Sequence, residues 1–206
     1  MRFSVTMLII TLCFAIFIAQ NIIPGFTETF ALIPAFALSG QAWQFVTYMF
    51  LHGSIGHLII NMFILFMFGV VIERAVGAKW FVIFFIVSGI GSALFHLLLS
   101  GQSLVIMLGA SGSIFGILAA FAFMFPDMRL FVFPLPVPVK AIYAVIGIAA
   151  FELIIGLTGI MPEIANFGHL GGLVTGVLLT ASWKYYKKHK LKRRSNQMRD
   201  FEFYWE

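Results

Sequence analysis

Long apolar runs are the feature that most constrains the fold of this chain. They cover about residues 5–23, 57–72, 80–99, 110–125, 139–157 and 167–185. A helix needs about 20 predominantly apolar residues to cross a bilayer. Charged residues make up only 10% of the chain, against about 25% in soluble domains. These runs exclude a soluble globule and a disordered chain, and they predict an all-α polytopic membrane protein with a bundle of six transmembrane helices.

The segment between the first two runs, residues 24–56, is of a different kind. Prolines and glycines interrupt it too often for a single span. The aromatic residues Trp43, Phe45, Tyr48 and Phe50 make it too apolar for a solvated loop, and such side chains favour the membrane interface. We therefore expect a partly membrane-embedded first loop that contains short helices.

The distribution of basic residues orients the predicted bundle. All 13 Lys and Arg residues fall on one side of the membrane on a six-span plan, seven of them in residues 184–194. Since basic loops stay in the cytoplasm, we expect an integral multi-pass protein with both termini cytoplasmic, and we take the membrane to be that of a prokaryotic cell. Residues 1–186 then form the membrane domain. Residues 187–206 form a basic cytoplasmic tail, which serves either as a topology anchor or as a contact for anionic lipid.

Four polar side chains inside the runs share one depth. Polar and ionisable groups are costly within a membrane and are candidates for function. With both termini inside, the second, fourth and sixth runs all enter from the outer face. His57 and Asn61 open the second run, Ser111 opens the fourth and His169 opens the sixth. Since His57 and Asn61 are four residues apart, they share a helix face, and the four groups together predict a site near the outer face.

Glycines spaced four residues apart accompany two of these groups. They are Gly112 and Gly116 in the fourth run, and Gly168, Gly172 and Gly176 in the sixth. Such stripes allow helix backbones to approach closely. If the two stripes pack together, the imidazole of His169 reaches the hydroxyl of Ser111. Phe115, one turn below Ser111, can support the ring, and Asn166 can cap the start of the sixth helix.

These residue types together suit nucleophilic catalysis. A serine hydroxyl is a weak nucleophile until a base accepts its proton, and histidine can change its charge near neutral pH. Ser111 and His169 would form this pair. The backbone amide of Ser111 and the side chains of His57 and Asn61 would donate hydrogen bonds to the oxyanion. No carboxylate is obviously placed as a third member, so we expect a Ser–His dyad.

Each of these residues also has a structural explanation when it is taken alone. A serine beside glycine in a membrane helix often only packs, a membrane histidine can pair with a backbone carbonyl, and a His–Asn pair can join two helices. Glu152 in the fifth run either faces the cavity or reaches outward to the interface, and we favour a structural role for it. His96 in the third run is expected in packing or at the interface. The catalytic hypothesis therefore depends on the shared depth.

Four sequence elements carry a resemblance to a known family. They are His52-Gly-Ser-Ile-Gly-His57-Leu-Ile-Ile-Asn61, Glu73-x-x-x-Gly77, Gly109-Ala-Ser111-Gly112 and Gly168-His169-Leu-Gly-Gly172. On a six-helix plan the chain resembles the rhomboid intramembrane serine proteases in their minimal six-helix form. The likeness covers the second to sixth runs and the loop before them. In that loop the family commonly has Trp-Arg where this chain has Trp43-Gln44, which changes the hydrogen bonds that the loop can form.

The resemblance implies a serine endopeptidase that hydrolyses transmembrane substrates near the outer membrane face through an acyl-enzyme. It implies Ser111 as the nucleophile, His169 as the general base, and His57, Asn61 and the Ser111 amide as oxyanion donors. The supporting positions are His52, Glu73, Gly109, Gly112, Phe115 and Asn166. The fifth helix is the implied gate for substrates. We expect transmembrane proteins and membrane lipid as partners, and no cofactor, metal or nucleic acid.

Two other function classes remain open. The first is a catalytically inert rhomboid-like binder of transmembrane clients, although such a protein is expected to lack the Ser or the His. The second is a transporter or a zinc site, because His52, His57 and His169 could gather around a metal ion. No HExxH pattern accompanies them, and the single cysteine, Cys13, excludes a Cys-based zinc site within one chain. The sequence leaves the substrate, the cleavage site and the oligomeric state open.

Overall fold

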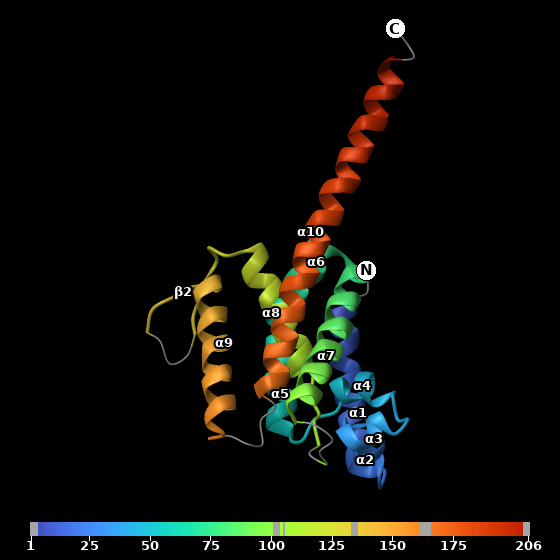
Figure 1. Ribbon diagram of the computed structural model, residues 1–206, viewed down its shortest axis with the longest axis vertical. Coiled ribbons are helices and arrows are strands. Elements are labelled where there is room, and N and C mark those ends of the chain that lie inside the picture. Colours follow the sequence, from blue (N-terminus) through green and yellow to red (C-terminus); the bar gives the residue numbers. More distant parts are fainter. Residues whose placement is uncertain (1–3, 101–103, 105, 133–135, 161–165, 204–206) are drawn as a thin grey trace.

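The described part of the chain is built around six long helical segments. The computed structural model describes residues 4–100, 104, 106–132, 136–160 and 166–203. The long helices are α1 (Val5–Ile22), α5 (Ile55–Ile64), α6 (Val70–Val76), α7 (Ala78–Ser100), α8 (Ser111–Met124), α9 (Ala141–Thr158) and α10 (Asn166–Phe203). A π-helical turn, Leu65–Gly69, joins α5 to α6 into one segment. The predicted all-α, six-helix membrane architecture is thereby confirmed (Figure 1).

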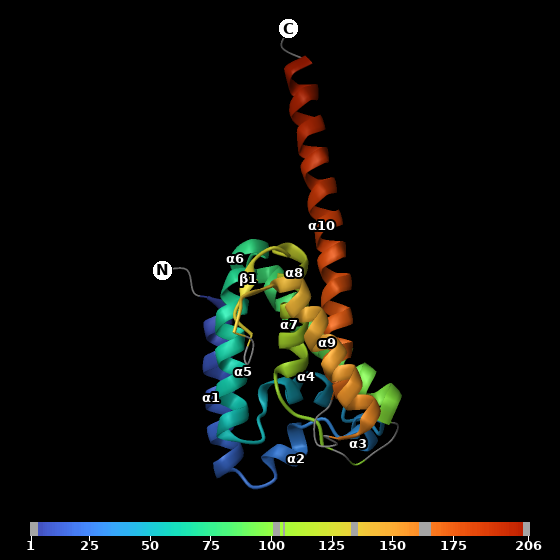
Figure 2. The ribbon, with the colours of Figure 1, turned by 90° about the vertical axis from the view of Figure 1, so that its left-hand side faces the viewer.

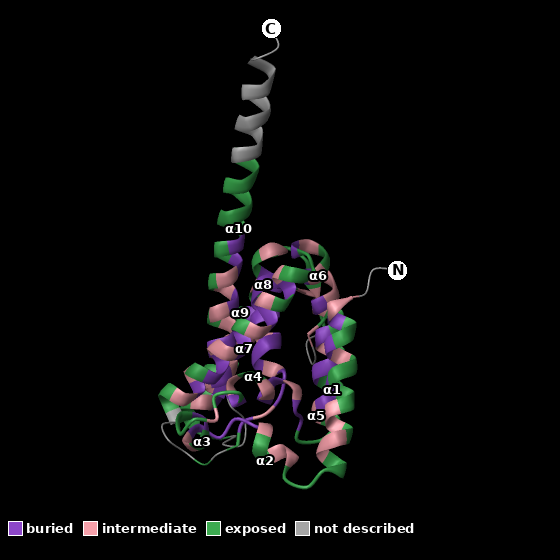
Figure 3. Ribbon diagram, turned by 90° about the vertical axis from the view of Figure 1, so that its right-hand side faces the viewer, coloured by how far each residue is buried: buried purple, intermediate pink, exposed green. Residues whose placement is uncertain are grey.

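The six segments differ in whether they are long and apolar enough to cross a membrane. Within the described residues, four are long and apolar enough by length and composition: Val5–Ile22, Ile55–Val76, Ala78–Leu99 and Ala141–Thr158. α8 has only 14 residues and lies inside the bundle, where ten of them are buried (Figure 3). This agrees with the short fourth run, since a helix surrounded by protein need not match the thickness of the lipid.

The two ends of the bundle differ in content. α1 begins, and α10 leaves the bundle, at the same end (Figures 1 and 2). The opposite end, which we call the loop end, carries the starts of α5, α8 and α10 and the first loop. As predicted, this loop contains short helices: α2 (Phe26–Phe30), α3 (Pro34–Leu38), α4 (Gln44–Thr47) and a 3₁₀ turn, Tyr48–Phe50. The four polar side chains of the predicted site therefore belong to helix starts at one end of the bundle.

Two features of the remaining chain differ from a simple span-and-loop plan. α10 continues as a helix to Phe203 and projects beyond the bundle (Figure 1), so the expected domain boundary at residue 186 falls inside one helix. The connection from α8 to α9 contains a short antiparallel pair, β1 (Arg129–Leu130) with β2 (Val139–Lys140). Next to it, Nζ of Lys140 lies 2.7 Å from a carboxylate oxygen of Asp127.

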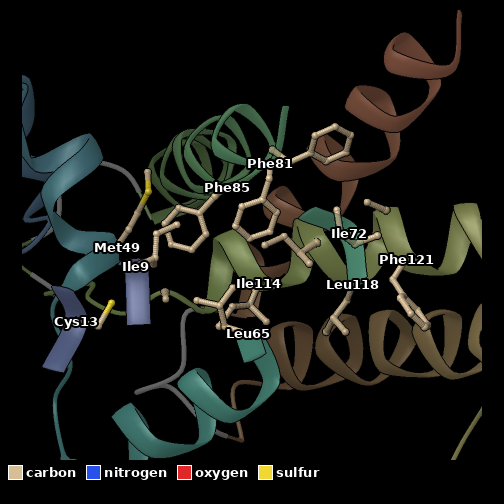
Figure 4. Packing of buried hydrophobic residues seen from close by; sticks show 14 of the residues in the cluster. Ile9, Cys13, Met49, Leu65, Ile72, Phe81, Phe85, Ile114, Leu118 and Phe121 are labelled. Carbon is tan, nitrogen blue, oxygen red and sulfur yellow. The ribbon is translucent and has the colours of Figure 1, made fainter. Parts of the chain in front are cut away.

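α8 is in close contact with α10 through the two glycine stripes. A methyl group added at Gly172 would overlap the backbone of Gly112, and one added at Gly176 would overlap that of Gly116. Large apolar side chains fill the space around α8, and Figure 4 shows those that it shares with its neighbours: Leu65, Ile72, Phe81, Phe85, Ile114, Leu118 and Phe121. The packing thus holds the starts of α8 and α10 side by side.

Candidate active site

Ser111 is the first residue of α8 and follows a tight turn. Gly109 has a φ of +127°, a positive value that glycine adopts readily. Its amide donates a hydrogen bond to the carbonyl of Tyr48 at 3.0 Å. A methyl group at Gly109 would lie 2.8 Å from the ring of His57. Backbone conformation and space both require glycine here, and the turn holds Ser111 close to α5.

The hydroxyl of Ser111 contacts His169. Oγ of Ser111 and Nε2 of His169 are 2.8 Å apart, which is a hydrogen-bond distance. His169 is the fourth residue of α10, and the Gly172–Gly112 contact joins the two helices one turn further along. The ring of Phe115 stacks on the imidazole, with ring centres 4.4 Å apart and planes inclined by 7°. The side chains of Ser111 and Phe115 on α8 therefore both contact His169 on α10, as the glycine stripes predict.

His57 and Asn61 lie on the other side of this turn. Oγ of Ser54 accepts a hydrogen bond from the His57 amide at 3.2 Å, and this cap fixes the start of α5. Asn61 is buried, with 4% of its surface exposed. Within the described residues, its Nδ2 has no hydrogen-bond partner. A methyl group at Gly109 would lie 3.6 Å from this nitrogen. A buried donor without a partner is costly, so Asn61 holds an unused donor beside the turn that precedes Ser111.

Glu152 lies at the site, which is the first of the two positions that the sequence left open for it. It lies on α9 with 8% of its surface exposed. Its Oε2 is 3.1 Å from Nδ1 of His169 and accepts a hydrogen bond from Nδ2 of Asn166 at 2.8 Å. The structure thus places a carboxylate beside the predicted Ser–His pair, where the sequence showed none obviously placed. Asn166 is the first described residue of α10, and its side-chain amide donates to Glu152.

His52 is buried beside His57, and its backbone binds Gln20 of α1. The two rings meet edge to face, with their centres 5.2 Å apart. Oε1 of Gln20 accepts a hydrogen bond from the His52 amide at 3.0 Å. Burial, and then the neighbouring His57, lower the pKa of His52 to about 4, so its ring is neutral at neutral pH. A cavity of about 510 Å³ adjoins it and is lined in part by Gln20 and Thr27. These surroundings fit a supporting position in the loop.

Glu73 lies at the other end of the bundle from Ser111 and binds the start of α1. Its carboxylate accepts hydrogen bonds from the hydroxyl of Ser4 at 2.8 Å and the amide of Val5 at 2.8 Å. It also accepts from the amide and the hydroxyl of Thr6, at 2.9 and 2.7 Å. The negative charge interacts favourably with the positive end of the helix dipole. Glu73 therefore supports the attachment of α1 rather than the candidate site.

Gln44 occupies the loop position where an arginine is common in the family named above. It is fully buried. Its Oε1 accepts a hydrogen bond from the Ile33 amide at 2.9 Å, and its Nε2 donates to Oε1 of Gln41 at 2.8 Å. The neighbouring Trp43 donates from its indole to the carbonyl of Thr29 at 3.0 Å. The loop thus forms a hydrogen-bond network around Gln44 without the arginine.

The histidines His52, His57 and His169 do not form a metal site together. Within the described ranges, no three His, Cys, Asp or Glu side chains gather closely enough to hold a metal ion. His52 and His57 are neighbours, while His169 pairs with Ser111. His96 is buried on α7, with 7% of its surface exposed, which agrees with a place in packing.

Comparisons with known proteins agree with these elements. The Rhomboid domain family model matches residues 39–185. The chain is 32% identical over 139 residues to RHOMBOID-like protein 6, mitochondrial, of Arabidopsis thaliana, which covers 68% of this chain and 43% of that protein. It is 31% identical over 166 residues to Rhomboid protease AarA of Providencia stuartii, covering 71% of this chain and 58% of the relative. It is 31% identical over 158 residues to Rhomboid-like protease 3 of Toxoplasma gondii, covering 77% and 56%. The chain therefore spans less than two thirds of each of these relatives.

Proposed function

The chain belongs to the rhomboid family, and we propose that it is an intramembrane serine protease that hydrolyses peptide bonds of transmembrane substrates near the outer membrane face. Its relatives include proteins named as proteases. The observation that carries the proposal is the 2.8 Å contact between Oγ of Ser111 and Nε2 of His169. A serine and a histidine at this distance, at the starts of two membrane helices, form the nucleophile and base of an acyl-transfer site.

The proposed reaction has two steps. Nε2 of His169 accepts the hydroxyl proton of Ser111 while Oγ attacks the carbonyl carbon of the substrate. The tetrahedral intermediate collapses when His169 gives this proton to the leaving amine, and an ester on Ser111 remains. A water molecule, deprotonated by the same nitrogen, then attacks the ester and releases the new carboxylate. The hydroxyl of Ser111 regains its proton, so the enzyme returns to its starting state.

Three donors would stabilise the oxyanion of both intermediates. The amide of Ser111 stands at the start of α8, where backbone N–H groups have no partner within the helix. Nδ2 of Asn61 has no hydrogen-bond partner within the described residues, and the ring of His57 lies against the same turn. Donors that are already in place cost little reorganisation when the charge develops, and removal of one such donor typically lowers kcat about 100- to 1,000-fold.

The membrane setting supports this reaction near one face. The chain is an integral, multi-pass membrane protein, and the loop end carries Ser111, His57 and His169. We propose that this end faces outward and that both termini are cytoplasmic, because on the six-span plan the 13 basic residues all belong to the opposite side. A site close to the surface can obtain the water that hydrolysis needs, while substrates in the lipid reach it from the side.

An inert binder of transmembrane clients is the alternative function. It keeps the fold and the membrane contacts but has no use for an activated serine. The hydrogen bond between Ser111 and His169, the stacked ring of Phe115 at 4.4 Å and the unused donor on Asn61 favour catalysis. Each of these features serves acyl transfer, and binding alone requires none of them.

Cleavage of a transmembrane reporter in liposomes tests the proposed function. The wild-type protein, Ser111→Ala and His169→Ala are reconstituted separately with a fluorescently tagged single-span substrate, and the fragments are followed by gel electrophoresis. We expect fragments from the wild type and none from either variant. Gly147→Ala is the matched control, because nothing lies within 4 Å of a methyl group at that position. Cleavage by purified Ser111→Ala at the wild-type rate would contradict the proposal.

A further inference from the structure

Glu152 is a buried acid in an otherwise apolar membrane helix. No other residue of α9 is charged, and only 8% of the surface of Glu152 is exposed. A carboxylate inside a membrane protein is costly unless it is paired and hydrogen-bonded. The buried residues in the first half of α9 are small or aliphatic. In its second half the buried residues are Glu152 and Ile155. The acid therefore lies where α9 meets the site, and the reaction outlined above does not use it.

One oxygen of Glu152 connects α9 to the catalytic helix. Oε2 lies 3.1 Å from Nδ1 of His169 and accepts the hydrogen bond of Asn166 at 2.8 Å. Asn166 and His169 are three residues apart on α10 and so share a face. The contact between Glu152 and α10 requires α9 and α10 to approach closely. A methyl group at Gly156, one turn after Glu152, would lie 3.1 Å from the ring of Phe167.

We propose, on the basis of the function proposed above, that Glu152 is a positioning residue for His169. The carboxylate favours the tautomer that carries its proton on Nδ1, which leaves the lone pair of Nε2 for the proton of Ser111. When Nε2 takes that proton, the negative charge beside Nδ1 stabilises the imidazolium. Glu152 stays ionised throughout, so no further proton moves. Asn166 fixes the carboxylate oxygen by its own hydrogen bond.

This assignment adds a third member to the expected Ser–His pair, supplied by a different helix. Nδ1 of His169 faces Glu152 from α9, while Nε2 faces Ser111 from α8. Because the acid belongs to α9, any displacement of α9 removes the carboxylate from the base. The position of α9 relative to α10 therefore affects the reactivity of Ser111.

The rate of labelling by a small fluorophosphonate tests this inference, because the probe reports the reactivity of Ser111 without a protein substrate. Glu152→Gln keeps the size of the side chain and removes the charge. We expect its labelling rate to fall roughly 10- to 100-fold, within the range of general acid–base contributions. On a peptide substrate kcat should fall by a similar factor with KM little changed. Glu152→Asp, which restores the charge on a shorter stem, should recover part of the rate.

The controls separate this inference from the proposed function and from a purely structural role. Glu28→Gln removes an exposed carboxylate on α2 and should label at the wild-type rate. If Ser111→Ala still labels, the proposed function fails. If Ser111→Ala is silent and Glu152→Gln labels at the wild-type rate, only the role of Glu152 is wrong. A lowered thermal midpoint together with an Asp variant no faster than Gln would also overturn it, since that pattern marks an anchor of α9. If Glu152→Gln does not fold, a folded Glu152→Ala, which also lacks the charge, would overturn the role of Glu152 by labelling at the wild-type rate.

Discussion

Replacing Gly172 by alanine asks whether the contact between α8 and α10 sets the geometry of the site. Gly172 lies three residues after His169 on α10 and packs on the backbone of Gly112, the residue after Ser111. A methyl group at Gly172 would lie 2.8 Å from the carbonyl carbon of Gly112, whereas ordinary contacts begin at 3.4 Å, and the carbonyl oxygen would be closer still. The helices must therefore separate by at least the difference, about 0.6 Å.

This separation is large enough to change the reaction while leaving the fold in place. If the helices move apart as rigid bodies, the distance from Oγ of Ser111 to Nε2 of His169 grows from 2.8 Å to about 3.4 Å or more, beyond the usual hydrogen-bond range. A misplacement of about 1 Å can cost about 100-fold in rate, so we expect a loss of roughly 10- to 100-fold. Overpacking costs about 1–3 kcal/mol, and alanine returns up to about 1 kcal/mol of helix propensity. The net loss of stability is therefore about 3 kcal/mol at most.

The assay for Gly172→Ala combines the rate of fluorophosphonate labelling with the thermal midpoint in detergent. Gly147→Ala on α9 is the matched control, because nothing lies within 4 Å of its added methyl group; it should keep the wild-type rate. A Gly172→Ala protein that labels as fast as the wild type would refute the argument that this backbone contact holds Ser111 and His169 together.

Three further predictions concern the support of the site. Glu73→Gln should weaken the attachment of α1 by about 1.5–3 kcal/mol, the scale of hydrogen bonds to a charged group. This should appear as a lower unfolding midpoint, which Glu28→Gln should not show. The pKa of His52 is about 4 in the folded state, against 6.5 for an unperturbed histidine. Between pH 4 and 6.5 its ring is therefore protonated in the unfolded chain and neutral in the folded protein. Stability should therefore fall as the pH drops from 6.5 to 4, by up to about 3 kcal/mol, in midpoints measured against pH, and His52→Asn should flatten this slope. Gln44→Ala leaves the Ile33 amide without its acceptor and should cost about 1–3 kcal/mol, measured by the same unfolding assay; an unchanged midpoint would show that the loop does not depend on it.

The sequence predicted the pairing of α8 and α10 because its signals were local. Glycine spacing identified the two faces, and the positions of Ser111 and His169 at helix starts identified their depth. The direct contact of the stripes then follows from the close approach that only glycine permits. The short helices of the first loop were also visible from its prolines and glycines, but their exact arrangement around Gln44 was not, because it depends on long-range hydrogen bonds.

The partners of Glu152 and Glu73 could not be predicted in the same way. α9 is apolar on every side, so no pattern shows which face it turns to the bundle, and the contact from Glu152 to His169 depends on that rotation. The depth of Glu152 in the membrane could nevertheless be estimated. Glu152 lies six residues before the end of α9 at Thr158, which is about 9 Å along the helix axis. His169 lies near the start of the next helix, α10. The role of Glu73 depends on residues more than 60 positions away, which no local pattern reveals.

The site of covalent modification tests the central claim most directly. The purified protein is treated with a fluorophosphonate probe, digested and mapped by mass spectrometry, alongside Ser111→Ala and His169→Ala. A nucleophile at Ser111 activated by His169 predicts one adduct, on Ser111, that is absent from both variants. An adduct on another residue, or labelling of His169→Ala at the wild-type rate, would contradict the account.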